Sequence, residues 1–523
     1  MYIGLYLVRA AKLYPDRLAV IDYSTGRRFT YKQLNERVNR LANGLIGIGL
    51  KKGDRVAELM FNCNEAVESE AAYCKTGLVK VPINVRLSIK EIIQQLNNSE
   101  ASALILHPSF FQQIIENRSK IKTVEYFVGI SNTQEDMIDY EKLLDGGSVA
   151  EPEIEVGLDD LYKLQYTSGT TGILKAAMLT HRNYLCRLRN NLMSTGTHPG
   201  YPVVQAYIAP VTHAAGGYLW MTYVKGGSNI LLNMNPFDPQ KLLEVIEKEK
   251  VTDIFLIPVM INMLLNYPDL KKYDFSSLRT IVYGTAPMAP DRIKQALGVF
   301  GPVLRQGYGQ TESLAVGTFL YKDDHITNDD PIREGRLASV GTPCVDVEMR
   351  VVDEDIKDLP PGEVGEIIIR GDCVMKGYWK DPERTADTIR NGWLYTRDMG
   401  YMDEGGYLFL TDRKSDMIIS GGFNIYPTEV ENTLAEHPAV YESAVIGVPD
   451  DMWGEAVKAV VVLKPGAEVT ESELIEHCKL RLASYKKPKT VDIVESLPKS
   501  VVGKILRRVI REPYWQGRRR RVN

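Results

Sequence analysis

Apolar and polar positions alternate in blocks along the first half of the chain. Short apolar runs at 55–62, 79–84 and 102–108 predict buried strands, and the segments 64–78 and 89–99 between them have the periodicity of helices. The same order returns later, with a predicted helix over 241–250, a strand over 252–260, a further helix and a strand over 278–284. Alternating elements of this kind predict an α/β protein with doubly wound, parallel-type sheets, whose ligands bind beyond the carboxyl ends of the strands.

The pattern changes at about residue 335. Short β-rich runs separated by Asp, Pro and Gly predict a small antiparallel unit there. A charged stretch from Thr411 to Asp416 then precedes a final region with hydrophobic content of its own. The sequence therefore predicts a large domain over 1–411, a hinge over 412–416 and a small, mobile α+β domain over 417–523.

Composition narrows the class of protein. The 523 residues are 44% hydrophobic and 25% charged, which is typical of a globular protein too long for one core. The formal net charge of -4 gives no indication of nucleic-acid binding. No apolar run is long enough for a transmembrane helix, and the N-terminal residues lack the pattern of a signal peptide. The six cysteines are scattered without CxxC spacing, which argues against a zinc site or a disulfide framework and favours the cytoplasm.

Residues 166–183, YTSGTTGILKAAMLTHRN, contain the first candidate chemistry. The glycines let backbone amides approach a ligand, the hydroxyls of the run Thr167–Gly172 add donors, and Lys175 adds a positive charge. Such a loop suits the phosphates of a nucleotide, although its spacing is not that of a Walker loop. Alone, a run this short is more often a solvated connection.

Further motifs follow this loop in a fixed order along the chain. Together they resemble the adenylate-forming superfamily of acyl-CoA synthetases, luciferases and nonribosomal adenylation domains, and the resemblance spans essentially the whole chain. The motifs are PVTHAAGG (210–217), YGTAP (283–287), YGQTE (308–312), GWLYTRD (392–398), DRKSDMIISGGFNIYPTEVE (412–431) and PKSVVGKILRR (498–508).

The resemblance implies an ATP site. Tyr308 would stack on the adenine opposite residues 284–287, Asp398 would accept the ribose hydroxyls, and Glu312 would hold Mg²⁺. Each residue also has a plainer interpretation, as a core aromatic, a turn aspartate or a member of a surface salt bridge. The expected nucleotide-binding residues are Thr167, Ser168, Gly169, Thr170, Thr171, Gly172, Lys175, Gly284, Thr285, Ala286, Pro287, Tyr308, Gly309, Gln310, Thr311, Asp398 and Arg413.

The chemistry implied is the attack of a carboxylate on the α-phosphorus of ATP, a reaction that depends on cations placed around the reacting anions. Lys504 resembles the family's catalytic lysine, and its plainer interpretation is an ordinary basic surface residue. The loop with Gly421, Gly422 and Asn424 resembles the one that lines the tunnel for the pantetheine arm of coenzyme A, and otherwise is a glycine turn. The resemblance implies that attack on ATP gives an acyl-adenylate and pyrophosphate, and that in a second step the acyl group passes to the thiol of coenzyme A and AMP is released. In the family the small domain rotates between the two steps, which implies a hinge at Arg413–Ser415 here.

The acid itself is less well specified. His213 resembles the residue at the floor of the family's acyl site, and Gly307 with Ser313–Ala315 is expected to complete the pocket. Amino-acid-activating relatives place an Asp in this region, and none occurs between Ala209 and Val224. The acid is therefore expected to be fatty, alicyclic or aromatic, and the sequence does not choose among these.

Two other functions stay open at this point. One is an adenylating enzyme that passes the acyl group to a carrier protein, and the other is a non-catalytic relative that binds acyl groups or nucleotides. Departures from the family pattern favour the second alternative: Leu174 stands where the family usually has Pro, and Ala176 and Arg397 stand where it usually has Gly, whereas Lys504 and Glu312 oppose it. The departure at Ser415 concerns the expected hinge instead. A homodimer is one of the oligomeric states left open. The arginines at 518–521 are expected to be a solvated end, with a peripheral membrane contact as the alternative.

Overall fold

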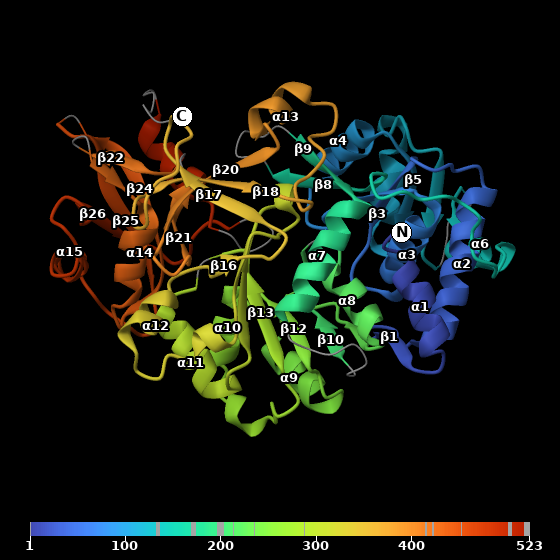
Figure 1. Ribbon diagram of the computed structural model, residues 1–523, viewed down its shortest axis with the longest axis horizontal. Coiled ribbons are helices and arrows are strands. Elements are labelled where there is room, and N and C mark those ends of the chain that lie inside the picture. Colours follow the sequence, from blue (N-terminus) through green and yellow to red (C-terminus); the bar gives the residue numbers. More distant parts are fainter. Residues whose placement is uncertain are drawn as a thin grey trace.

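The computed structural model describes residues 2–131, 136–168, 174–195, 203–212, 214–234, 236–286, 288–413, 416–420, 423–450, 452–499 and 505–516. Two large sheets, mostly parallel, form the first part of the molecule (Figure 1). The first sheet runs in the order β16 (Thr342–Pro343), β15 (Thr318–Leu320), β14 (Leu304–Tyr308), β13 (Thr280–Gly284), β12 (Asp253–Leu256), β10 (Val204–Tyr207), β11 (Ser228–Leu231), β1 (Leu18–Asp22) and β2 (Arg28–Thr30). The second runs in the order β7 (Ile138–Asp139), β6 (Tyr126–Gly129), β5 (Ala101–Leu106), β3 (Arg55–Leu59), β4 (Val79–Pro82), β8 (Leu161–Ser168) and β9 (Leu174–Thr180).

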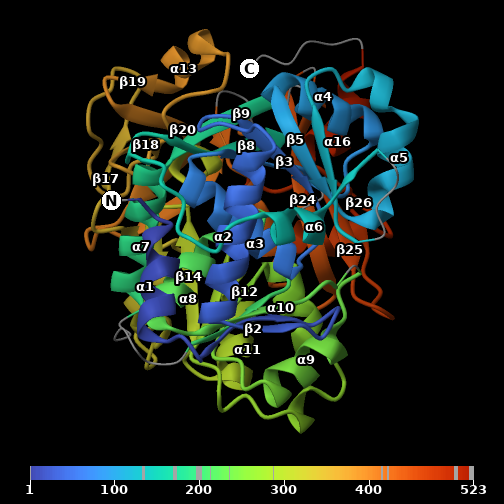
Figure 2. The ribbon, with the colours of Figure 1, turned by 90° about the vertical axis from the view of Figure 1, so that its right-hand side faces the viewer.

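Helices cover both faces of each large sheet, as the alternating pattern predicts. Figure 2 shows strands of the second sheet above, helices of the first sheet's outer face below, and α2 and α3 between them. The inner helices are α1 (Leu5–Leu13), α2 (Tyr31–Gly47), α3 (Asn64–Thr76), α6 (Tyr140–Gly146), α7 (His181–Ser194) and α8 (Tyr218–Lys225), which share one apolar core with both sheets. The outer helices are α4 (Ile89–Ser99) and α5 (Phe111–Glu116) on the second sheet and α9 (Pro239–Lys248), α10 (Pro258–Leu265) and α11 (Pro290–Phe300) on the first.

Local sequence explains where several of these helices begin. Thr30 with Gln33 and Ser88 with Glu91 form capping boxes at the starts of α2 and α4. One boundary expected from the sequence is wrong: the strand predicted over 252–260 ends at Leu256, and Pro258 begins α10. The reason is that proline has no N–H to donate to a strand ladder but fits the first turn of a helix.

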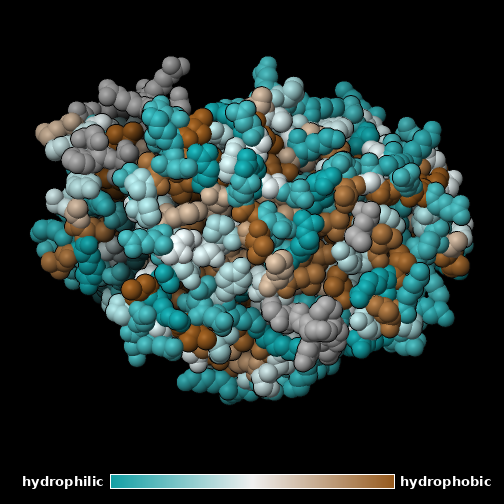
Figure 3. Space-filling view, in the orientation of Figure 1, coloured by the Kyte–Doolittle hydropathy of each residue, from teal (hydrophilic) through white to brown (hydrophobic). Residues whose placement is uncertain are grey.

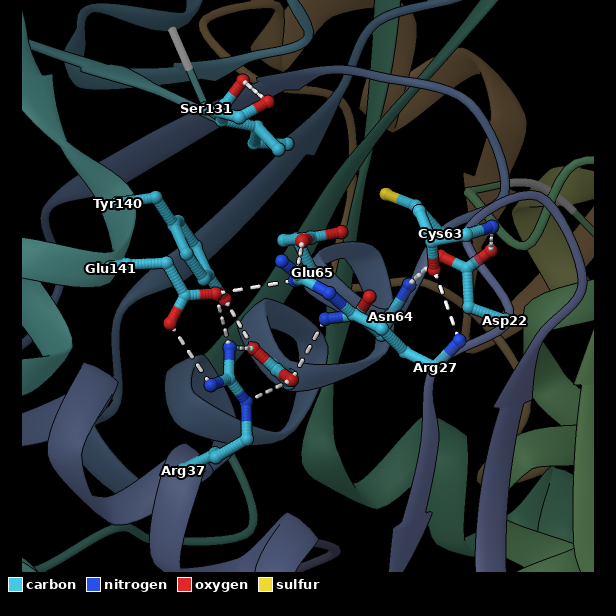
Figure 4. A network of polar contacts seen from close by, with 12 residues as sticks. Asp22, Arg27, Arg37, Cys63, Asn64, Glu65, Ser131, Tyr140 and Glu141 are labelled. Carbon is cyan, nitrogen blue, oxygen red and sulfur yellow. Dashed lines mark hydrogen bonds and ion pairs between the residues drawn. The ribbon is translucent and has the colours of Figure 1, made fainter. Parts of the chain in front are cut away.

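Helix α3 lies between the two large sheets and is buried along its whole length. Its polar residues therefore meet polar partners inside the molecule. On one side, Arg37 of α2 binds Glu68 and Glu141, and Tyr140 donates its hydroxyl to Glu68 at 2.9 Å. Figure 4 shows Arg37, Tyr140 and Glu141 converging in this network.

A second polar group on α3 faces the second sheet. Lys80 of β4 places Nζ 2.7 Å from Oε2 of Glu58 and also contacts Glu70 of α3, while Lys163 of β8 lies 3.5 Å from Oε1 of Glu70. We call Glu58, Glu70, Lys80 and Lys163 the buried quartet, because none is more than 1% exposed. Burial raises the pKa of Glu58 and lowers that of Lys163 to about 8. Burial also acts to raise the pKa of Glu70, but the two lysines outweigh it and hold that pKa below its usual value.

The small antiparallel unit predicted beyond residue 335 is present. Its strands are β17 (Glu348–Val352), β18 (Gly365–Arg370), β19 (Ile389–Arg390), β20 (Trp393–Met402) and β21 (Leu408–Arg413), accompanied by α12 (Pro331–Arg336) and α13 (Pro382–Thr388). The C-terminal unit follows, with β22 (Ile418–Ser420), β23 (Phe423–Ile425), β24 (Val440–Asp450), β25 (Gly454–Leu463), β26 (Thr490–Ile493), α14 (Pro427–Ala435), α15 (Glu471–Lys479) and α16 (Arg507–Arg511). Strand β21 extends to Arg413, so the first two residues of the expected hinge pair with β20 in their backbone.

Hydrophobic and hydrophilic residues are interspersed on the face drawn in Figure 3. No helix in the described part of the chain is both long and apolar enough to cross a membrane. All six cysteines are free and buried. Cys186, Cys344 and Cys373 share the core between α7 and the small antiparallel unit.

Candidate active site

Strands β8 and β9, at the edge of the second sheet, precede and follow the loop that is predicted to bind phosphates. The two strands pair in antiparallel fashion, with Thr167 opposite Lys175 and Ser168 opposite Leu174. Gly169, Thr170, Thr171 and Gly172 fall outside the described residues. Ala176 lies in the extended strand β9, where it has no positive φ, and it is 2% exposed, so the strand accommodates its methyl group without strain.

Strand β9 is held on its outer edge by residues 375–379. Met178 N donates to the carbonyl of Gly377, Lys376 N to that of Met178 and Trp379 N to that of Ala176, each at 2.9 Å. This pairing sets Tyr378 beside Lys175, whose Nζ lies 5.7 Å from the centroid of the tyrosine ring. A cation over an aromatic face is attracted by the ring's quadrupole.

The same tyrosine reaches Glu312. Its hydroxyl donates to Oε1 of Glu312 at 2.6 Å, and the backbone N–H of Met375 donates to the carbonyl of Glu312 at 2.8 Å. Burial and the neighbouring carboxylate of Glu312 raise the pKa of Tyr378, so its hydroxyl stays a proton donor. Tyr378 therefore links the lysine of the phosphate loop to the predicted metal ligand, a role that the sequence analysis did not predict. The run Gly377-Tyr378-Trp379 between lysines was the available signal.

Tyr308 and Asp398, predicted for the adenine and the ribose, are in direct contact. The hydroxyl of Tyr308 donates to Oδ2 of Asp398 at 2.8 Å, and Nε2 of Gln310 donates to the same oxygen at 2.6 Å. Nε2 of Gln310 also donates to the carbonyl of Thr396 at 2.7 Å. Asp398 is 9% exposed, and the backbone of Arg413 is its cross-strand partner on β21.

Close backbone approaches surround these side chains. Gly284 and Gly307 are partners on neighbouring strands, and a Cβ added to Gly284 would lie 2.5 Å from the carbonyl oxygen of Gly307. A Cβ added to Gly309 would lie 2.6 Å from the carbonyl carbon of Ala315. Thr285 has φ of 70°, a left-handed conformation that costs a non-glycine residue about 1–2 kcal/mol. Strain of this kind gathers where a fold fixes a functional loop.

Glycines in the motif around His213 are also close to their neighbours, although His213 itself and Pro287 lie outside the described residues. A Cβ on Gly216 would lie 1.9 Å from the carbonyl oxygen of Val211, and one on Gly217 would lie 2.2 Å from Cζ of Arg187. Gly216 cannot be replaced without moving the backbone, whereas a larger residue at Gly217 would have to displace the end of the Arg187 side chain.

Several predicted site residues of the C-terminal unit lie outside the described residues, and for these the structure describes only the residues beside them. Ser420 pairs with Phe423, so Gly421 and Gly422, which are not among the described residues, connect β22 to β23. The backbone of Asn424 pairs with Ile419 in this hairpin. Lys499 and Ile505 form an antiparallel bridge, and Lys504 lies between them in sequence, outside the described residues. Ser415 of the expected hinge is likewise not described.

The described site residues thus form two neighbouring groups. One contains Lys175, Tyr378 and Glu312, and the other contains Tyr308, Gln310 and Asp398. The segment 308–312, which ends in the short 3₁₀ helix at Thr311–Ser313, connects them. No cluster of three or more metal-ligating side chains occurs among the residues for which the structure gives positions.

Comparison with known proteins agrees with this arrangement. The family model described as AMP-binding enzyme matches residues 7–379, and the model of the AMP-binding enzyme C-terminal domain matches residues 429–504. The chain is 38% identical to a feruloyl-CoA synthase from Amycolatopsis sp, over 98% of this chain and 99% of that protein. It is 35% identical to a long-chain-fatty-acid–CoA ligase from Escherichia coli O6:H1, over 95% and 92%. Among solved structures, the amide bond synthetase McbA from Marinactinospora thermotolerans superposes with a TM-score of 0.88 at 31% identity, covering 98% of this chain and 100% of that one.

Proposed function

The chain belongs to the AMP-binding enzyme family and is an AMP-forming acyl-CoA synthetase, and from that premise we propose how its residues divide the work. The reaction has two halves. A carboxylate oxygen of the acid attacks the α-phosphorus of ATP, and the bond to the bridging oxygen breaks to release pyrophosphate. The thiol of coenzyme A then loses its proton and attacks the acyl carbon, and AMP leaves.

Asp398 holds the ribose in this proposal. Its carboxylate already accepts two hydrogen bonds, from Tyr308 and Gln310, and this fixes its orientation before a diol arrives. Tyr308 would stack on the adenine across from Gly284–Pro287, the segment that begins at the carboxyl end of β13. The half-buried position of Tyr308 is compatible with a ring that a ligand covers.

Lys175 and Glu312 act at the phosphates. Lys175 supplies a positive charge to the β- and γ-phosphates, and the hydroxyls of Thr170, Thr171 and Thr311 supply donors. Glu312 suits Mg²⁺, because this hard cation is held in nucleotide sites by one or two carboxylates and phosphate oxygens. Its Oε1 accepts from Tyr378, which holds the carboxylate and leaves Oε2 as the ligand oxygen. The metal, when bound, would neutralise charge that builds up on the phosphates.

The C-terminal unit is assigned a part in both halves of the reaction. Lys504 would place its ammonium at the reacting carboxylate and α-phosphate, and a rotation about Arg413–Ser415 would exchange it for the loop of Gly421, Gly422 and Asn424. Support comes from the position of Arg413 at the end of β21, directly before the unit begins. In this scheme the large domain comprises 1–411, the hinge 412–416 and the small domain 417–523.

The observation that carries the proposal is the chain of contacts from Lys175 through Tyr378 to Glu312. We propose measuring ATP–pyrophosphate exchange for Lys175→Met and Glu312→Gln, beside Lys376→Met as a matched control from the same pairing, whose side chain is exposed. The first two are expected to lose 10²-fold or more in exchange, a typical cost for removing an electrostatic contact to the transition state. Equal exchange by Lys376→Met and Lys175→Met would reject the assignment of Lys175.

A separate measurement tests the division between the halves. Lys504→Ala is expected to abolish exchange and to retain much of the thioester formation from supplied acyl-adenylate. If both steps fall equally, the rotation scheme is wrong.

A cytoplasmic location and a homodimer complete the proposal. Six free, buried thiols support a reducing compartment, and sedimentation of the purified protein tests the dimer.

A further inference from the structure

Helix α7 begins directly after β9, the strand that contains Lys175, and runs from the second sheet toward the first (Figure 1). A capping box forms its start. The hydroxyl of Thr180 accepts a hydrogen bond from the backbone N–H of Asn183 at 3.3 Å, and Oδ1 of Asn183 accepts from the backbone N–H of Thr180 at 2.8 Å. The cap uses only the oxygen of the Asn183 side-chain amide, so the amide nitrogen can bind outside the helix.

The amide nitrogen of Asn183 binds a segment that lies far away in sequence. Its Nδ2 donates to the carbonyl oxygens of Asp372 and Val374, each at 2.8 Å. A carbonyl only accepts and a backbone N–H only donates, so the three contacts are compatible with a single orientation of the amide. Asn183 is 3% exposed, and its hydrogen bonds are therefore shielded from competing water. The residue fastens the main chain on both sides of Cys373 to the start of α7.

The fastened chain leads directly to Glu312. Met375, the next residue, donates its backbone N–H to the carbonyl of Glu312 at 2.8 Å, and Tyr378 donates its hydroxyl to Oε1 of the same residue at 2.6 Å. Tyr378 also forms a backbone bridge to Ala177 of β9. Residues 372–378 are thus held by Asn183 at one end and by β9 at the other, and both contacts to Glu312 come from this segment.

A second contact between α7 and this segment is weaker. Nη2 of Arg189 lies 3.5 Å from Oδ2 of Asp372, and the same guanidinium lies 2.9 Å from Oδ2 of Asp346. The side chains of Arg189 and Asp372 are 48% and 46% exposed, and an ion pair with that exposure contributes little. The buried amide of Asn183, which binds the backbone directly, is the stronger constraint on residues 372–378.

Resting on the proposed function, we propose that Asn183 is a positioning residue for adenylate formation, which acts through residues 372–378 to orient Glu312 toward Mg²⁺ and the phosphates. Tyr378 can hold Oε1 of Glu312 only if the main chain that bears it stays in place. Without Asn183 the two carbonyls lose their common donor, and the segment loses its buried anchor on α7. Removing a group that orients a metal ligand typically changes metal affinity or activity by about 10- to 100-fold.

The test uses Asn183→Asp, with the acid that is most active in a panel of aliphatic and aryl acids. The aspartate keeps an oxygen for the backbone N–H of Thr180, so the cap persists, but it turns a second oxygen toward two carbonyl oxygens. ATP–pyrophosphate exchange is expected to fall about 10-fold or more in kcat/KM for ATP. Thioester formation from supplied acyl-adenylate needs no metal-bound ATP and is expected to stay within about 2-fold of wild type. An equal loss in both half-reactions would overturn the inference.

Titration calorimetry of ATP gives a second readout that does not depend on turnover. In wild type, Mg²⁺ is expected to tighten the binding of ATP. In Asn183→Asp the tightening should shrink about 10-fold, because the carboxylate of Glu312 is no longer held in place. Equal tightening in both proteins, or none in wild type, contradicts the proposal. Wild type that exchanges with no acid would reject the proposed function, whereas the calorimetric comparison would still test Asn183, since it requires no acid.

Two matched variants separate positioning from stability. Thr180→Val removes the other half of the capping box but keeps both donors of Asn183, so it is expected to lower the melting midpoint and to leave exchange near wild type. Arg189→Met removes the exposed contact and is expected to change neither. Asn183→Ala lacks both donors without adding charge, and it replaces the aspartate variant if that protein does not fold. If Thr180→Val loses as much exchange as Asn183→Asp, the start of α7 is what matters and the inference is wrong.

Discussion

Lys80→Met removes the central cation of the buried quartet and leaves the carboxylates of Glu58 and Glu70 buried, with Lys163 as the remaining cation of the quartet. Lys80 contacts both glutamates, and all three side chains are at most 1% exposed. Breaking a buried ion pair from one side costs about 3–5 kcal/mol, because the remaining charge has neither water nor a partner. The equilibrium constant for unfolding should therefore rise about 10²- to 10⁴-fold.

A thermal melt at a fixed scan rate measures this effect without requiring reversibility. The double variant Lys80→Met with Glu58→Gln restores the charge balance by leaving the pair of Glu70 and Lys163, so its midpoint should recover most of the loss. Lys272→Met is the control, since its salt bridge with Asp269 is exposed and worth about 0–1 kcal/mol. In Lys80→Met the deficit should also shrink as the pH falls, because Glu58, whose pKa burial already raises, then becomes protonated. A single variant as stable as wild type, or a double variant less stable than the single, would refute the reasoning.

Three other changes have expected outcomes. Tyr378→Phe removes the hydroxyl that holds Glu312, so ATP–pyrophosphate exchange should fall about 10-fold with an unchanged melting midpoint; exchange equal to wild type would contradict this. Burial lowers the pKa of His181 to about 4, so the free energy of unfolding should fall by roughly 3 kcal/mol as the pH drops from about 6.5 to 4. His181→Gln should lose that part of the slope in acid denaturation, and an identical slope would reject the assignment. Arg397 has φ of 60° and an exposed ion pair with Asp387, so Arg397→Gly should stabilise the protein by about 0.5–1 kcal/mol in the same melt, and a lower midpoint would show that the ion pair outweighs the strain.

Elements whose pattern is local could be predicted from the sequence. Helix α4 has the bounds expected from its periodicity, because a capping box begins it. The strand predicted through residue 260 failed at Pro258, where one residue's geometry outweighs an apolar run. Helix α3 was expected, but its burial on all sides was not, because its charged residues find their partners on strands distant in sequence.

In the candidate site, too, the residues within sequence motifs could be predicted, whereas a contact between residues distant in sequence could not. Motif residues from three separate segments lie together in the structure, with Tyr308 against Asp398 and Lys175 near Tyr378. Tyr378 could not be identified beforehand, because its contact with Glu312 crosses 66 residues of sequence. The departure at Arg397 was noticed as a missing glycine, and the structure supplies the reason that glycine suits the position, a positive φ.

The burial of every cysteine has a chemical consequence for an enzyme that makes an acyl-adenylate. That intermediate acylates thiolates, and a thiol on the protein surface would compete with coenzyme A for it. Burial keeps the thiols protonated and out of reach, as the raised pKa values of Cys63, Cys74 and Cys344 indicate. The thiols of the folded enzyme should therefore not react with an aromatic disulfide reagent, so the reagent would measure only the loss of the free thiol of coenzyme A. The same reagent would react with six thiols once the chain unfolds, so one reagent would measure both the turnover of coenzyme A and the fraction of unfolded enzyme.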